Sequence, residues 1–136
     1  MGNSTENGCG RVNVLIIEKS RENLEVLETA VQRRGMNPLG TRWPSQGLEI
    51  IRQQNPDLIL LDIEAISSKN SQICEQFEAE SSARQTPLVV LGKNRRSRRD
   101  LPSGEQVTKP YHYAALVRRI EELLDLPHPA NSRTAA

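Results

Sequence analysis

Pro56-Asp57-Leu58-Ile59-Leu60-Leu61-Asp62 is the stretch that decides the fold of this chain. Its four consecutive aliphatic residues predict a strand buried on both faces, as the strands of a parallel α/β sheet are. Asp is depleted in strands, so the acid that ends this run needs a specific reason. In such sheets, chemistry lies beyond the carboxyl ends of the strands. Asp62 is therefore the first candidate functional residue.

Around this strand, short apolar runs alternate with segments of helical periodicity. Strands are predicted at residues 12–17, 36–41, 58–62, 88–91 and 105–108. Helices are predicted from near Arg21 to a Gly35 stop, from a Ser45 cap to Asn55, at 71–83 and at 113–124. The alternation predicts a flavodoxin-like, doubly wound α/β fold with a five-stranded parallel sheet in the order 2-1-3-4-5. The basic segment 93–103 has a weak helical pattern, so a shortened or missing fourth helix is expected.

Length and composition indicate one domain with a nearly balanced charge. The 136 residues predict a domain at 11–126, with a disordered tail at 1–10 and a flexible tail at 127–136. The net charge of +1 gives no global reason to expect nucleic acid or membrane as a partner. No apolar run is long enough to span a bilayer. Cys9 and Cys74 lack metal-ligand spacing, so a reducing, cytoplasmic setting is the simplest expectation.

Four motifs, in their order and spacing, resemble the receiver domain of bacterial two-component response regulators over roughly residues 12–124. They are Val14-Leu15-Ile16-Ile17-Glu18, Pro56 to Asp62, Thr86-Pro87-Leu88-Val89-Val90-Leu91 and Thr108-Lys109-Pro110. The resemblance implies a signalling module, not an enzyme, in which Asp62 accepts a phosphoryl group from a histidine kinase or phosphotransfer protein. It also implies that Lys109 contacts this group. Glu18, Asp62 and the backbone carbonyl of Glu64 would then hold a divalent cation such as Mg²⁺.

Four positions depart from the family pattern. Lys19 stands where a second acid is usual, and an ammonium there repels a divalent cation, so Mg²⁺ is predicted to bind weakly. Gly92 replaces a Ser or Thr whose hydroxyl would bond the phosphoryl group. Lys93 follows it where a small residue is usual, and Gln106 replaces an aromatic switch residue. These changes affect the cation site and the relay of a signal.

Two interpretations of the function remain open. In the first, the chain is a single-domain response regulator in a phosphorelay, and Asp62 is phosphorylated despite the incomplete metal site. In the second, it is a pseudo-receiver that works as a protein-protein interaction module without phosphorylation. Lys19 would then pair with Asp62 and permanently replace the cation.

The output is expected to be protein contact. No second domain follows Leu124, so a DNA-binding output is not expected, and the downstream target is placed on the last strand and helix around Tyr113 and Arg118. The same elements offer a face for a homodimer. The basic stretch Arg95 to Arg99 is either a solvated loop or a docking patch. Trp43 and Tyr111 are expected to pack at the rim of the domain.

A flavodoxin-like fold also serves nucleotide-binding proteins, cobalamin-binding proteins and small hydrolases, because a fold alone does not decide function. The sequence has no Gly-rich phosphate loop after its first strand, no G-x-S-x-G and no CxxC motif. These alternatives therefore have weak support.

Overall fold

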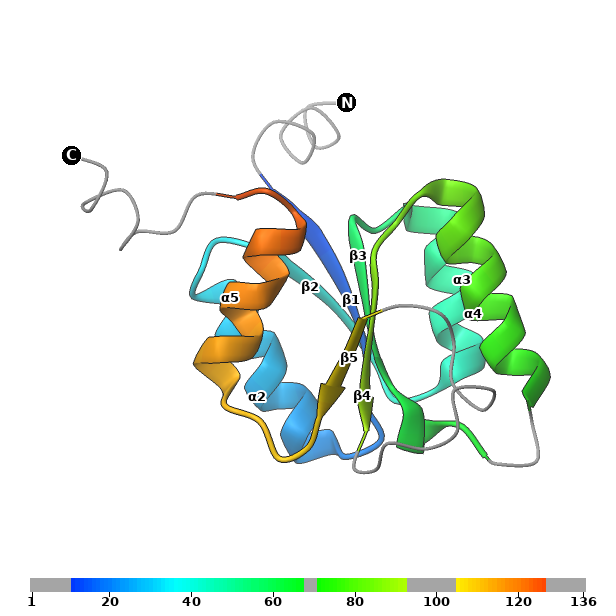
Figure 1. The fold of residues 1–136 in the computed structure, drawn as a ribbon, viewed down its shortest axis with the longest axis horizontal. Coiled ribbons are helices and arrows are strands. Elements are labelled where there is room, and N and C mark those ends of the chain that lie inside the picture. The colour runs from blue at the N-terminus through cyan, green and yellow to red at the C-terminus, as the bar shows by residue number, and fades with distance from the viewer. Residues whose placement is uncertain (1–10, 68–70, 93–104, 127–136) are drawn as a thin grey trace.

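Five parallel strands form a single sheet in the order β2-β1-β3-β4-β5, as the sequence predicts (Figure 1). The computed structural model describes residues 11–67, 71–92 and 105–126. The strands are β1 (Asn13–Ile17), β2 (Asn37–Thr41), β3 (Leu58–Asp62), β4 (Leu88–Gly92) and β5 (Glu105–Thr108). All five residues of β3 are buried, which confirms that the run before Asp62 is a central strand.

Helices cover both faces of this sheet. Figure 1 shows α2 (Arg21–Gln32) and α5 (Tyr113–Leu123) on one face, and α3 (Pro44–Gln54) and α4 (Ser71–Arg84) on the other. Side chains of a strand alternate between the two faces, so they form two apolar cores. Val14 and Ile16 join one core, while Leu15 and Ile17 join the other. None of the described helices is long and apolar enough to cross a membrane.

The predicted end of α2 is confirmed, whereas the predicted start of α3 is wrong. Gly35 has φ +86°, its N–H bonds to Gln32, and the N–H of Met36 bonds to Val31. This pair of bonds is the Schellman arrangement, so Gly35 ends α2 as predicted. The Ser45 cap was wrong, because α3 begins at Pro44 and Trp43 precedes it without a side-chain cap bond. Proline fits the first helical position, since its preset φ is helical and it has no N–H to satisfy.

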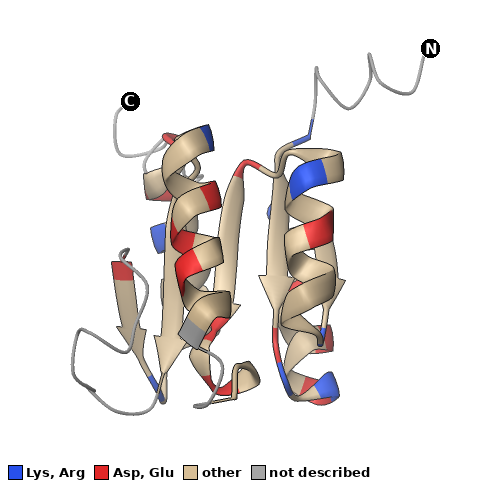
Figure 2. Ribbon diagram, turned by 90° about the vertical axis from the view of Figure 1, so that its right-hand side faces the viewer, with Lys and Arg blue, Asp and Glu red and all other residues tan. Residues whose placement is uncertain are grey.

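Surface charge joins the two helices on the α3 and α4 face. Glu80 of α4 lies 3.1 Å from Arg52 of α3 and 2.8 Å from Arg84. Figure 2 shows this face, with acidic positions concentrated along α4.

Several predictions fall outside the described residues. They concern the tails at 1–10 and 127–136, and the segment 93–104, which contains Lys93 and the stretch Arg95 to Arg99. The predicted shortening of the helix between β4 and β5 lies in the same segment.

Candidate functional site

Asp62 is the last residue of β3 and lies at the carboxyl edge of the sheet. Its side chain is 1% exposed, and its Oδ1 accepts a hydrogen bond from the Glu64 N–H at 3.1 Å. This bond caps η1 (Ile63–Ala65), the short 3₁₀ turn that follows the strand. The carboxylate is therefore fixed by its own turn, and burial of an ionised carboxylate requires a compensating charge nearby.

Lys109 supplies that charge. The chain leaves β5 at Thr108, and the Lys109 N–H donates to the Gly92 carbonyl at 2.7 Å, which anchors the residue beside β4. Its Nζ lies 2.9 Å from Asp62 Oδ1 and 3.6 Å from Glu64 Oε1. Burial lowers the pKa of the ammonium, but the hydrogen bond to Asp62 and the charges of Asp62, Glu18 and Glu64 outweigh burial and raise it. Lys109 is therefore a cation at physiological pH.

Glu18 follows β1 and completes the cluster. It is 1% exposed, and its Oε2 accepts from the Ser20 N–H at 3.2 Å. Its Oε1 is buried and has no hydrogen-bond partner among the residues that the structure describes. Burial, followed by the hydrogen bond and charge of Asp62, raises the pKa of Glu18 to about 7, while the Ser20 N–H and the Lys109 charge act against this shift. Glu18 is thus poised between its protonated and ionised forms near neutral pH.

Lys19 does not fill the cation's place, which corrects the pairing predicted for a pseudo-receiver. Its side chain is exposed, and it forms no ion pair with any part of the chain at 11–67, 71–92 or 105–126. Only its backbone N–H approaches Asp62, at 3.4 Å from Oδ2. The physical reason is the direction of the chain. Where β1 ends, the buried Glu18 turns inward and the next side chain turns toward solvent. Lys109 is the residue that pairs with Asp62.

The remaining altered positions lie around this cluster. Gly92 ends β4, and a Cβ added there would lie 2.9 Å from Ile63 Cγ2. A Ser or Thr at this position would therefore press against the residue that follows Asp62. Gln106 is exposed on β5, opposite Val90 in the register. Lys93 lies outside the described residues.

Comparison with known proteins gives related sequences and a shared fold. No protein-family model matches the chain. The nisin biosynthesis regulatory protein NisR of Lactococcus lactis is 28% identical over 114 residues, which are 79% of this chain and 48% of NisR. The polar-differentiation response regulator DivK of Brucella ovis is 23% identical over 79 residues, which are 58% of this chain and 64% of DivK. The chain thus spans about half to somewhat under two thirds of these relatives.

Solved structures show the same fold. A CheY-like response regulator receiver domain protein from Methanospirillum hungatei aligns with a TM-score of 0.71 at 17% identity, covering 84% of this chain and 94% of that one. HP1043, described as an orphan response regulator of H. pylori, aligns with a TM-score of 0.67 at 22% identity, covering 83% and 96%. The chain is thus similar in sequence to response regulators and has the fold of a CheY-like receiver domain.

The cluster was also predicted to hold a divalent cation. The buried Glu18 Oε1, which lacks a hydrogen-bond donor, and the Asp62 carboxylate are oxygen ligands of the type that Mg²⁺ prefers. No group of three His, Cys, Asp or Glu side chains that could hold a metal exists within the described part of the chain. Asp62 Oδ1 is already paired with the ammonium of Lys109. These residues fit a divalent cation with two carboxylates at most.

The predicted partner face is accessible. Tyr113 begins α5 and is half-buried, while Arg118 is exposed one turn later. Trp43 was expected to pack at the rim, but its side chain is 58% exposed, with the Arg42 guanidinium 5.3 Å above its ring. Tyr111 is half-buried, and this prediction was correct.

Two contributions to the site were missed at the sequence level. The Glu64 side chain reaches Lys109, although only its carbonyl was considered. The backbone N–H groups of Lys19 and Ser20 point at the two acids. The acidic character of Glu64, two positions after Asp62, could have indicated its side-chain contact with Lys109. The backbone N–H donors could not be predicted, because no pattern of side chains indicates them.

Proposed function

We propose that this receiver domain accepts a phosphoryl group on Asp62 in a two-component phosphorelay. The observation that carries the proposal is the contact of 2.9 Å between Lys109 Nζ and Asp62 Oδ1, inside a buried cluster that also contains Glu18. Phosphoryl transfer is accelerated mainly by positioning and by cations placed where negative charge develops. Lys109 is such a cation, and it is held in place before any donor arrives.

The two oxygens of Asp62 are not equivalent. Oδ1 accepts from the Glu64 N–H and from Lys109, whereas Oδ2 has only the long contact of 3.4 Å to the Lys19 N–H. Oδ2 is therefore the more available nucleophile. In the proposed step its lone pair forms the new O–P bond, the P–N bond to a phosphohistidine breaks, and the electron pair of that bond returns to the imidazole nitrogen.

The residues around Asp62 would stabilise the negative charge of the phosphoryl group. Lys109 is close enough to stabilise the negative charge of the phosphoryl group as it is transferred from the donor to Asp62. Glu18, Asp62 and the Glu64 carbonyl would hold Mg²⁺, whose chemical contribution is to neutralise phosphoryl oxygens. The exposed ammonium of Lys19 and the missing second acid make this binding weak.

The alternative function is a pseudo-receiver that binds partner proteins without phosphorylation. It is favoured by the absence of a hydroxyl at Gly92 and by Lys19 in place of a second acid beside Glu18. The similarity to a response regulator described as an orphan is consistent with it. In this alternative, Lys109 takes the role that was predicted for Lys19.

The proposed partners follow from these roles. The phosphodonor is a histidine kinase or phosphotransfer protein, and the downstream target is a protein that docks on β5 and α5 near Tyr113 and Arg118. The same face is the proposed surface for a homodimer. The proposed location is the cytoplasm, and the proposed receiver domain extends over residues 11–126.

The test is intact-mass analysis after incubation with acetyl phosphate and Mg²⁺. One added phosphoryl group is expected on the wild type and on Asp57→Asn, because Asp57 is exposed at the start of β3, where it accepts from the Asn13 N–H. Asp62→Asn should carry none. A wild type that stays unmodified, under conditions that modify an ordinary receiver domain, would favour the pseudo-receiver.

A further inference from the structure

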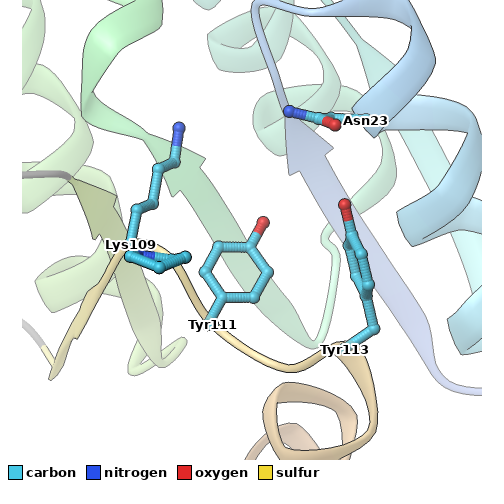
Figure 3. Close-up of a pocket in the computed structure, with 5 residues that line it drawn as sticks. Asn23, Lys109, Tyr111 and Tyr113 are labelled. Carbon is cyan, nitrogen blue, oxygen red and sulfur yellow. The ribbon is translucent and has the colours of Figure 1, made fainter.

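A pocket of about 450 Å³ lies next to the phosphoacceptor site, between the first turn of α2 and the loop from β5 to α5. It is lined by Asn23, Lys109, Pro110, Tyr111 and Tyr113 (Figure 3). This volume is in the range of small-molecule sites, roughly 300–1,000 Å³. Of its lining residues, only Lys109 belongs to the cluster around Asp62.

The two tyrosines form an aromatic corner. Their ring centroids are 5.5 Å apart and the rings are inclined at 83° to one another. A flat ring placed in such a corner can stack on one tyrosine and meet the other edge to face, and both arrangements are favourable for aromatic pairs. The corner is thus suited to a planar aromatic group.

Three polar groups converge on the same space. Figure 3 shows the Tyr111 and Tyr113 hydroxyls and the Asn23 carboxamide directed toward the pocket. Within residues 11–67, 71–92 and 105–126, none of these three side chains has a hydrogen-bond partner, since the bond from Asn23 to Ser20 Oγ is donated by the backbone N–H and not by the carboxamide. Half-buried polar groups without protein partners favour a ligand that carries hydrogen-bonding groups of its own.

The charges around the pocket favour a cationic ligand. The ammonium of Lys109 is already compensated by Asp62 at 2.9 Å and Glu64 at 3.6 Å. Burial raises the pKa of Tyr111, and the charges of Glu18 and Asp62 raise it further, so this hydroxyl is neutral and lies in a negative potential. An anion would be repelled there, whereas a cation gains from the acids and from the faces of the tyrosine rings.

We propose that this pocket binds a small aromatic amine, with its flat ring in the corner between Tyr111 and Tyr113 and its protonated nitrogen donating hydrogen bonds to a tyrosine hydroxyl or the Asn23 carboxamide. The proposal goes beyond the phosphorylation of Asp62 and does not depend on it. Because Lys109 lines the pocket and also pairs with Asp62, an occupant would touch the lysine of the phosphoacceptor site.

Titration of the full chain with tryptamine, followed by ¹H–¹⁵N correlation NMR without phosphodonor or Mg²⁺, tests this proposal. Saturable shifts are expected at the amides of Asn23, Tyr111 and Tyr113. Tyr113→Ala should weaken binding by about tenfold or more, and Tyr113→Phe, which keeps the ring, should weaken it by only about threefold. Trp43→Ala is the matched control, since it removes an exposed aromatic side chain that does not line the pocket, and it should leave binding unchanged.

Indole-3-acetate serves as the anionic counterpart and should bind at least about tenfold more weakly than tryptamine. Asn23→Ala is a second variant on a different element, which protects the test against a misfolded Tyr113→Ala, and it should also weaken binding. The proposal is overturned by the absence of saturable shifts, by shifts that centre on Trp43, or by pocket variants that bind as well as the wild type. Equal or tighter binding of indole-3-acetate would overturn the assignment of a cation.

Discussion

Three charged side chains from distant parts of the sequence meet at one edge of the sheet. Glu18, Asp62 and Lys109 end β1, β3 and β5 or follow them directly, so parallel strands bring them together. Two acids and one ammonium in a buried site leave a net negative charge. Burial, reinforced by the hydrogen bond and charge of Asp62, raises the pKa of Glu18 to about 7.

At the residue scale, Lys19→Asp should strengthen Mg²⁺ binding. The change removes an ammonium and supplies a carboxylate next to Glu18. Two unit charges about 4 Å apart interact by about 4 kcal/mol at an effective dielectric of 20. Because the Lys19 side chain is exposed and therefore screened, the expected gain is smaller, about 1–2 kcal/mol or about tenfold in Kd. Isothermal titration with Mg²⁺ measures it, and tight binding by the wild type would contradict the assignment.

Glu18→Gln should stabilise the fold at alkaline pH. The folded pKa of Glu18 lies above the ordinary value, so ionisation costs folding free energy that is absent below pH 4.5 and complete above about pH 7. Glutamine resembles the protonated form, so the variant should match the wild type near pH 5 and exceed it by about 1–3 kcal/mol at pH 8. Urea unfolding in the presence of a chelator measures the difference.

Glu22→Gln is the control for this pH dependence, because Glu22 is exposed in the first turn of α2. The free energy of unfolding of the Glu22→Gln variant should differ from that of the wild type by the same small amount at about pH 5 and at about pH 8. A Glu18→Gln variant with an equally constant difference would show that Glu18 is not buried beside Asp62.

At the element scale, β4 and η1 pack too closely to accept a side chain at Gly92. Gly92→Ala should cost about 1–3 kcal/mol of unfolding free energy, because the new Cβ meets Ile63 Cγ2 at 2.9 Å. Ile63→Ala removes that methyl group. Gly92→Ala should therefore cost less unfolding free energy in the Ile63→Ala variant than in the wild type, with a coupling of about 1 kcal/mol between the two substitutions. Urea denaturation of the four proteins in the cycle measures it. Strictly additive effects would show that η1 does not lie against Gly92.

An ion pair joins the turn that follows α2 to α5. Arg34 lies 2.8 Å from the carboxylate of Glu121, whose side chain is 4% exposed. Arg34→Ala should lower the free energy of unfolding by about 1–3 kcal/mol, because a buried charge loses its neighbouring cation. Arg33→Ala, at the exposed neighbouring position, should stay within about 0.5 kcal/mol of the wild type in the same thermal melts.

The element order and the cluster around Asp62 were predictable because they depend on strong local patterns. Uninterrupted apolar runs predicted β1, β3 and β4. Because these strands are parallel, the residues at their carboxyl ends lie at the same edge of the sheet. The burial of Glu121 was not predictable, since its position in the periodicity of α5 does not reveal that the turn after α2 brings Arg34 to it. The exposure of Trp43 was missed for a related reason. A large aromatic residue is usually buried, but the Trp43 ring lies at the surface against the Arg42 guanidinium, a contact that no periodicity reveals.

At the scale of the whole molecule, two sites share one lysine. The charged cluster around Asp62 lies beyond β1 and β3, and the pocket lies between α2 and the loop that leads to α5. Lys109 pairs with Asp62 and also lines the pocket. The sheet fixes the cluster, whereas Tyr111 reaches the pocket from the connection before α5 and Tyr113 reaches it from the first residue of α5. This difference explains why the cluster was predicted from motifs and the pocket was not.

The most direct measurement is to locate the phosphoryl group within the chain. After reaction with acetyl phosphate and Mg²⁺, borohydride reduces an aspartyl phosphate to homoserine, which peptide mass mapping can place at a single position. Homoserine at position 62, with unmodified Asp57 in the same digest, is the predicted result. Modification at any other carboxylate, or none at position 62 when an ordinary receiver domain is labelled in parallel, would contradict the assignment of Asp62 as the phosphoacceptor.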